Sequence, residues 1–187
     1  MIRGLPKYLT QDELHRFFAA ISSPRDLALF AVIYHYGLRV DEATALTLED
    51  LDLKNHRLRL RRLKNGLGGE KPLWRHTAKQ LRAYLRVRYG AGPYVFTGRE
   101  GPLKKRQIQG LFKRYAKAAG VSGRSVHSLR HSIAVHLLDA GRGIEYVADH
   151  LGHKNIQNTQ IYAQISHPLR ELIFRELERH PKIVRIA

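Results

Sequence analysis

The spacing of apolar residues in this chain is helical, changes to strict alternation in one region, and is helical again after it. Between residues 51 and 74, apolar and polar residues alternate, most clearly in the run Arg-Leu-Arg-Leu-Arg at 57–61, which is the pattern of a half-buried strand. An Asn-Gly pair at 65–66 and a Gly-Gly pair at 68–69 mark a hairpin turn inside this region. The spacing on both sides is helical. The pattern therefore predicts an α+β fold, mainly α, with a small antiparallel sheet that is basic on its outer face.

Three helices are expected before the sheet. Thr10 and Glu13 have the spacing of a capping box, and apolar residues follow at helical intervals. Pro24 predicts the start of a second helix, because the first turn does not use the N–H that proline lacks. This helix is apolar on most faces, so we expect it to be central and to end at Gly37. Asp41 is expected to cap a short third helix over residues 42–46.

The part of the chain after the sheet is predicted to be helical. One helix is expected over residues 77–89, a second ends at Gly120, and a third runs from Ser125 or His127 to Ala140. Two shorter helices are expected over 144–151 and 156–165. An apolar stripe at 169–177 either folds onto its own domain or docks on a neighbouring protomer. The 187 residues are expected to form a single domain, with a lead-in at 1–9, a core at 10–165 and a tail at 166–187.

The charge of the chain indicates its class of partner. With 33 basic and 16 acidic residues the net charge is +17, far more than solubility needs, so we expect a polyanion, with double-stranded DNA as the leading candidate. An anionic membrane surface is second, but no long apolar run supports it. The absence of cysteine excludes disulfides and thiolate chemistry. A cytoplasmic protein associated with the nucleoid is the expectation.

A set of polar residues suited to phosphodiester chemistry is concentrated near the C-terminus. His127, Arg130, His131, His153 and Tyr162 fall within thirty-six residues of each other, and a further arginine occurs at position 39. A guanidinium group can bond two phosphate oxygens at once and keeps its charge, so Arg130 and the arginine at 39 are expected to grip the phosphate. The phenol at 162 is the candidate nucleophile.

Proton transfer is the harder part of this chemistry. Free tyrosine has a pKa of about 10, so ionising it at pH 7 costs about 4 kcal/mol, and a nearby base or cation must lower that cost. His127 is a candidate base because it lies on the same helix face as Arg130. The departing sugar oxygen needs an acid. Lys64 beside the hairpin turn is the first candidate for that acid, and Lys71 is the alternative.

Other interpretations of the charged and polar residues have weaker support in the sequence. The run Lys104, Lys105 and Arg106 is either a solvated helix start or a DNA-binding segment. His127 and His131 have the spacing of a metal pair, but no third ligand is evident. The glycines near position 68 do not have P-loop spacing, and the carboxylates resemble cap and turn residues rather than a two-metal nuclease site. Neither a metal nor another cofactor is expected.

Five short segments, in order, resemble the sequence boxes of the tyrosine recombinases, the phage integrase family, and most of all its Xer-type and small integrase branch. Residues 37–42 (GLRVDE) resemble the first arginine box, and Lys64 falls where the family places its hairpin lysine. Residues 127–131 (HSLRH), 151–155 (LGHKN) and 159–162 (TQIY) resemble the remaining boxes. The resemblance covers residues 5–167 and implies a helical catalytic domain with a three-stranded antiparallel sheet.

The resemblance implies a role for each residue of the set. Arg39 and Arg130 would clamp the scissile phosphate, and Lys64 would protonate the leaving 5′-oxygen. Tyr162 would form a 3′-phosphotyrosyl bond with DNA, without metal or ATP. His127 and His153 would also be catalytic, because they would assist proton transfer and bond the phosphate. Glu42 and His131 would have supporting roles, Glu42 by holding the first arginine.

The resemblance also implies an assembly. Four protomers would exchange strands between two DNA sites, whereas the free protein would be a monomer or a weak oligomer. Most members have a separate N-terminal domain that closes around the DNA, and here it is expected to be absent, either by excision or in a naturally minimal recombinase. A DNA-binding regulator that no longer cuts, and a type IB topoisomerase, are the alternatives.

Overall fold

The structure, a computed structural model, describes residues 6–62, 67–90, 92–164 and 175. Its helices are α1 (Gln11–Ala19), α2 (Pro24–His35), α3 (Val40–Thr44), α4 (Arg75–Leu85), α5 (Lys105–Ala118), α6 (Val126–Asp139), α7 (Ile144–Leu151) and α8 (Gln157–Ala163). A 3₁₀ turn, η1 (Leu48–Asp50), precedes the strands β1 (Leu51–Asp52), β2 (Arg57–Leu60) and β3 (Gly69–Pro72); β4 (Thr97–Gly98) and β5 (Gly101–Pro102) come later. The mainly helical α+β prediction is confirmed.

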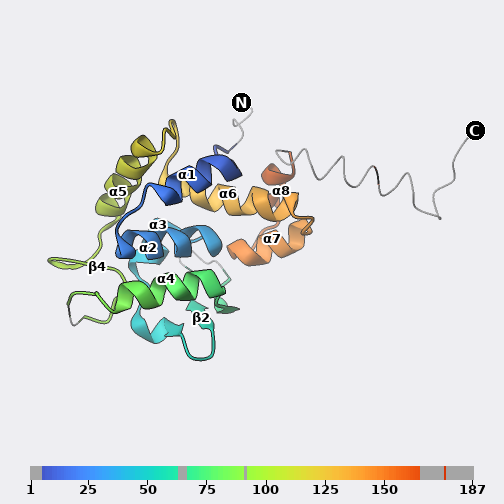
Figure 1. Cartoon of the computed structure of the whole chain (residues 1–187). Coiled ribbons are helices and arrows are strands. Elements are labelled where there is room, and N and C mark those ends of the chain that lie inside the picture. The colour runs from blue at the N-terminus through green and yellow to red at the C-terminus, as the bar shows by residue number, and fades with distance from the viewer. Residues whose placement is uncertain (1–5, 63–66, 91, 165–174, 176–187) are drawn as a thin grey trace, which may run out of the picture.

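The central element is α2, as the sequence predicted. Every residue from Ala28 to Ile33 is buried, because this helix packs on α4 at one side and on α6 at the other. Figure 1 shows α2 between the layer of α1 and α6 and the layer of α4, with α7 and α8 at one end of the molecule. The hydroxyl of Ser23 accepts from the Asp26 N–H and closes the first turn. The core therefore surrounds a helix that ends at His35, two residues before Gly37.

The predicted sheet is present as the antiparallel order β1-β2-β3 within the described residues. Leu58 and Leu60 are buried, whereas Arg57 and Arg59 are exposed. The alternation in the sequence therefore determines which side chains face the core and which face solvent. The ribbon formed by β4 and β5 was not predicted. Its strands have two residues each, too few for a period to be visible in the sequence.

The predicted bounds of two helices were wrong. Helix α3 begins at Val40 rather than at residue 42, and Asp41 lies inside its first turn instead of capping it. The carboxylate of Glu42 closes this turn, because it accepts the Arg39 N–H at 2.9 Å. Helix α4 spans Arg75–Leu85 instead of 77–89, since Arg88 turns the chain by donating to the carbonyls of Gly92 and Tyr94.

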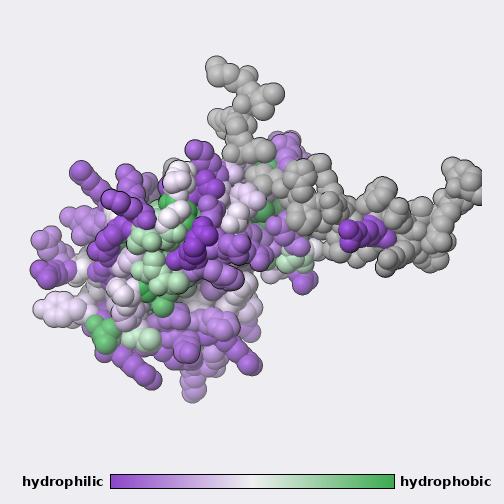
Figure 2. Space-filling view, turned by 45° about the horizontal axis from the view of Figure 1, so that its top comes forward, coloured by the Kyte–Doolittle hydropathy of each residue, from purple (hydrophilic) through white to green (hydrophobic). Residues whose placement is uncertain are grey.

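Most of the predicted C-terminal tail, including the apolar stripe at 169–177 except residue 175, lies outside the described residues. Within the part of the chain that the structure describes, no helix is long and apolar enough to cross a membrane. Hydrophilic residues cover most of the face shown in Figure 2.

Candidate active site

The candidate site forms where the C-terminal ends of α2 and α7 meet. Gly37, just past α2, has a φ of 56°, a conformation that glycine adopts at low cost. A Cβ atom built on it would lie 2.5 Å from Cδ2 of Leu151, the last residue of α7. Only a residue without a side chain lets the two helix ends come this close. Their carbonyls, which have no partner within the helices, therefore face a shared space.

Arg130 fills that space. Its side chain projects from α6, is 1% exposed, and donates to the carbonyl oxygens of Gly37 and Leu151, the latter at 3.0 Å. Helix C-termini carry partial negative charge, so they stabilise a buried guanidinium. Burial, followed by the charges of neighbouring arginines, lowers the pKa of Arg130 to about 10. It remains a cation at neutral pH.

Arg39 is the second cation of the site and, unlike Arg130, it reaches solvent. Its side chain is 28% exposed and its guanidinium lies 2.8 Å from the buried carboxylate of Glu42. Burial would raise the pKa of Glu42, but the hydrogen bond from the Arg39 N–H and the charge of Arg62 outweigh it and lower the pKa. Glu42 is therefore an anion that holds the Arg39 guanidinium and backbone N–H.

A cavity of about 510 Å³ opens beside Arg39. His127 also lines this cavity, together with side chains from α5. The pKa of His127 is lowered, first by desolvation and then by the charges of Arg130 and Arg39. The basic residues that line this cavity are Arg39, Lys105, Lys113, Arg124 and His127. Lys105 is thus on the cavity wall, and it also pairs with Asp41 at 3.0 Å. Lys104, just before α5, and Arg106, in its first turn, are exposed but do not line the cavity.

His153 lies against Arg130. Its Nε2 atom is 2.9 Å from the guanidinium, and its Nδ1 atom is 2.8 Å from the hydroxyl of Thr159. A guanidinium group can only donate, so Nε2 accepts and the proton resides on Nδ1. Burial, and then the charges of Arg130 and other nearby cations, lower the pKa of His153 to about 4. His153 is therefore neutral, in a tautomer that the two bonds determine.

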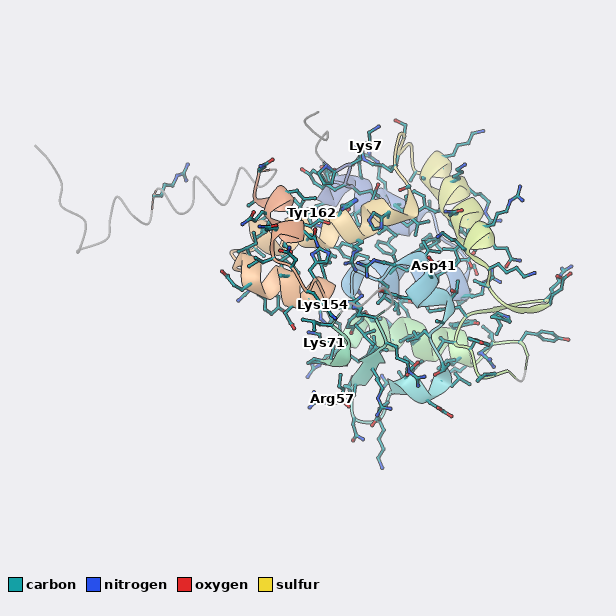
Figure 3. All side chains as sticks on the ribbon, turned by 180° about the vertical axis from the view of Figure 1, so that it is seen from behind. Lys7, Asp41, Arg57, Lys71, Lys154 and Tyr162 are labelled. Atoms are coloured by element: carbon teal, nitrogen blue, oxygen red, sulfur yellow. The ribbon has the colours of Figure 1, made fainter. Side chains whose placement is uncertain are left out.

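Tyr162 lies on α8 where that helix packs on α6 (Figure 3). Its side chain is 2% exposed, and its hydroxyl is 2.8 Å from Nδ1 of His131. Burial raises the pKa of Tyr162, while the charges of Arg130 and Arg39 oppose the rise. Burial also lowers the pKa of His131 to about 4, with help from His127 and Arg130. A protonated phenol thus meets a neutral imidazole.

The structure brings most of the predicted residues into one network. Arg130 contacts His153, Tyr162 contacts His131, and the rings of His131 and His127 meet edge to face with centroids 4.4 Å apart. Lys64 lies outside the described residues. Lys71, the alternative acid, forms an ion pair with Asp149.

One buried residue of the network, Arg62, was missed. It donates to Glu42 at 2.9 Å and its side chain is 1% exposed. The alternation of β2 could have revealed it, because residues 58, 60 and 62 share the inward face. Among the described residues, no group of three or more His, Asp or Glu side chains is arranged to hold a metal ion.

Known proteins resemble this chain over most of its length. The model of the phage integrase family matches residues 7–167. The tyrosine recombinase XerA of Pyrococcus horikoshii is 33% identical over 176 residues, which cover 91% of this chain and 61% of the relative. The tyrosine recombinase XerC of Thermodesulfovibrio yellowstonii is 32% identical over 198 residues, covering 96% of this chain and 64% of the relative. The chain thus spans somewhat more than half the length of these curated relatives.

Solved structures show the same fold. The crystal structure of XerA recombinase superimposes with a TM-score of 0.81 at 27% identity, covering 96% of this chain and 67% of that one. The XerH site-specific recombinase, in a post-cleavage complex with a palindromic difH substrate, gives 0.78 at 22% identity, with coverages of 95% and 54%. At that identity the second likeness concerns the fold alone.

Proposed function

Because this chain belongs to the phage integrase family, we propose that it is the catalytic domain of a site-specific DNA recombinase that breaks and rejoins strands through a covalent 3′-phosphotyrosyl bond at Tyr162. One observation carries the proposal. The Tyr162 hydroxyl lies 2.8 Å from Nδ1 of His131, and the charges of Arg130 and Arg39 oppose the rise in its pKa that burial causes. A buried tyrosine with a purely structural role does not need two arginines nearby.

The two arginines would bind the scissile phosphate. Arg130 is fixed by backbone carbonyls and by His153, and Arg39 is fixed by Glu42, so neither needs to reorganise as charge develops on the phosphate. Clamping both non-bridging oxygens in this way stabilises the five-coordinate transition state.

Strand cleavage then requires two proton transfers. The Tyr162 oxygen attacks phosphorus and forms the new P–O bond, while its proton passes to an imidazole. His131 already lies within hydrogen-bonding distance of that proton, and His127 is next to it on the cavity wall. The bond from phosphorus to the 5′-oxygen breaks, and Lys64 would supply the proton to that oxygen. The phosphotyrosyl ester stores the energy of the broken bond, so the proposal needs neither ATP nor metal.

Double-stranded DNA is the proposed partner, and a tetramer on two paired sites is the proposed assembly. The net charge of +17 and the basic side chains on the cavity wall favour a phosphate backbone as the ligand. Such a protein would act at the nucleoid. Residues 10–165 would form the catalytic core of a single domain, since α3, α4 and α6 pack on α2, and α7 and α8 pack on α6.

A pool of nicked suicide duplexes tests the proposal without knowledge of the target sequence. Each duplex has a randomised core and loses a short fragment on cleavage, so that the covalent complex cannot religate. We expect a DNA-linked band on a denaturing gel, absent for Tyr162→Phe. Sequencing the linked DNA would also identify the preferred site.

Two results would contradict the proposal. DNA binding without a covalent band would indicate a regulator that does not cut. Relaxation of a supercoiled plasmid that lacks the selected site, at the rate found with the site, would indicate a topoisomerase.

A further inference from the structure

Arg62, two residues beyond β2, is a charged side chain with almost no access to solvent. It is 1% exposed, and a buried charge of this kind is rarely found without partners. Its guanidinium donates to the Glu42 carboxylate at 2.9 Å, to the Tyr36 carbonyl at 2.9 Å and to the His150 carbonyl at 2.8 Å. Each of its two terminal nitrogens already donates twice, since the Gly37 carbonyl is a fourth acceptor at 3.5 Å, so neither is left to donate to a DNA phosphate. Any effect it has on the reaction must pass through its neighbours.

The first of these neighbours is Glu42, which Arg62 shares with Arg39. One carboxylate oxygen accepts from the Arg39 guanidinium at 2.8 Å. The other accepts from the Arg39 backbone N–H and from Arg62, each at 2.9 Å. Arg62 thus supplies the cation on the buried side of the carboxylate, and Arg39 supplies the one on the cavity side. Such a carboxylate cannot rotate without breaking bonds to both arginines.

The other neighbours are the two helix ends that surround Arg130. Arg62 binds the carbonyl of Tyr36 at the end of α2 and that of His150 at the end of α7, and Arg130 binds the carbonyl of the next residue at each end. The two guanidinium groups therefore bridge the same pair of helix ends, one residue apart. Their cationic charge matches the partial negative charge of both helix C-termini. If Arg62 is lost, the spacing that seats Arg130 changes.

Gly152 shows how closely Arg62 fits here. This residue follows α7 with a φ of 68°, and a Cβ atom on it would lie 2.9 Å from Nε of Arg62 and 2.7 Å from the carbonyl oxygen of Leu67. The N–H of Leu67 also donates to the Gly152 carbonyl at 3.2 Å. The residues on either side of segment 63–66 are thus both packed on the end of α7.

We propose that Arg62 is a positioning residue of the phosphate-binding site, which orients Arg39 through Glu42 and fixes the helix ends that seat Arg130. The inference rests on the proposed function, since it takes the two arginines to bind the scissile phosphate. A competing role would be to place Lys64, two residues further along the chain. The two roles predict different chemical rescues.

The test is single-turnover cleavage of a suicide duplex by Arg62→Met, a change that keeps an unbranched side chain and removes the planar fork. At saturating protein we expect the rate to fall about 100-fold, as for a catalytic group misplaced by about 1 Å. The dissociation constant for DNA should change by less than about threefold, because Arg62 does not reach the phosphate backbone. Arg62→Lys, which keeps the charge but not the fork, should recover only part of the rate.

Substituted phosphates then separate the two roles. A methylphosphonate at the scissile position is neutral and depends less on cations, so it should reduce the difference between Arg62→Met and the unchanged protein. A sulfur in place of the 5′-bridging oxygen leaves without an acid, so it should not reduce this difference. Arg59→Met, on the exposed face of β2, is the control and should cleave at the rate of the unchanged protein. Circular dichroism shows whether each variant is folded at the assay temperature.

Three results would overturn the inference. Arg62→Met could cleave as fast as the unchanged protein, or lose only DNA affinity. Alternatively, the bridging sulfur could restore its rate while the methylphosphonate does not, which would mean that Arg62 acts through the leaving-group acid. Failure of the unchanged protein to form any covalent complex would refute the proposed function as well, and is thus distinguished from the other three.

Discussion

The guanidinium of Arg130 donates to Nε2 of His153 across 2.9 Å, and this bond determines which nitrogen of the imidazole carries its proton. The other nitrogen then donates to Thr159, a fully buried threonine on α8. The orientation of His153 therefore depends on a hydroxyl group that lies three residues before the proposed nucleophile, on the same helix.

Thr159→Val should slow strand cleavage. Valine has the shape of threonine but cannot accept from Nδ1 of His153, so the tautomer and the ring orientation are no longer fixed. We expect the rate to fall about tenfold, a fraction of what a well-placed acid–base group contributes. Unfolding should become easier by about 1–3 kcal/mol, since a buried donor is left without its partner. Thr159→Ser keeps the hydroxyl and is the matched control; equal rates for the two variants would contradict the assignment.

The bond between Tyr162 and His131 can be tested by stability alone. Tyr162→Phe and His131→Leu each remove one partner, and the double variant removes both. Because the bond is largely buried, the two changes should couple by about 1 kcal/mol in the free energy of unfolding, measured in urea. Strictly additive effects would mean that the two groups do not interact in solution.

Stability should fall as the solution is acidified below pH 6.5. An imidazole whose pKa is lower in the folded than in the unfolded chain binds its proton more weakly when folded, so its stabilisation is complete above 6.5 and is lost as the pH falls toward 4. Each such group adds a slope of about 1.4 kcal/mol per pH unit in that window. Urea unfolding between pH 4.5 and 7.5 measures the slope, and a flat profile would refute the prediction. The groups with a pKa of about 4 are His35, His131, His150 and His153.

Gly37→Ala should damage both stability and cleavage. Its backbone has a positive φ, and the new methyl group would lie 2.5 Å from the Leu151 side chain. We expect a loss of about 2–4 kcal/mol from strain and overpacking, and slower cleavage because the Gly37 carbonyl helps to seat Arg130. Gly110→Ala is the control: this glycine lies inside α5 with no atom within 4 Å of the added carbon, so alanine should stabilise by about 1 kcal/mol. Equal melting temperatures for the two variants would contradict this account.

The sequence predicted the central helix and the sheet because both depend on local patterns. The alternation at 57–61 and the apolar run before Gly37 each extend over enough residues for a period to be recognised. The cap of α3 was harder to predict, since two neighbouring acids could reach it. Glu42 closes that turn because its longer side chain, three residues past the cap, reaches back to the Arg39 N–H.

The candidate site could be predicted only as far as its members lie in recognisable segments. Arg39, Arg130 and Tyr162 lie in such segments, as do their partners Glu42, His153 and His131, but Arg62 does not. Arg62 meets Tyr36 and His150, which are 26 and 88 residues away in the sequence. The tertiary packing that joins two helix ends creates these contacts, and a local pattern contains no information about them.

Mapping the covalent bond tests the central claim most directly. After cleavage of the selected suicide duplex, the complex is digested with protease and nuclease, and the linked peptide is analysed by mass spectrometry. We predict a peptide that carries a nucleotide through a 3′-phosphate ester on Tyr162. A nucleotide attached to any other residue, or through a 5′-phosphate, would contradict it.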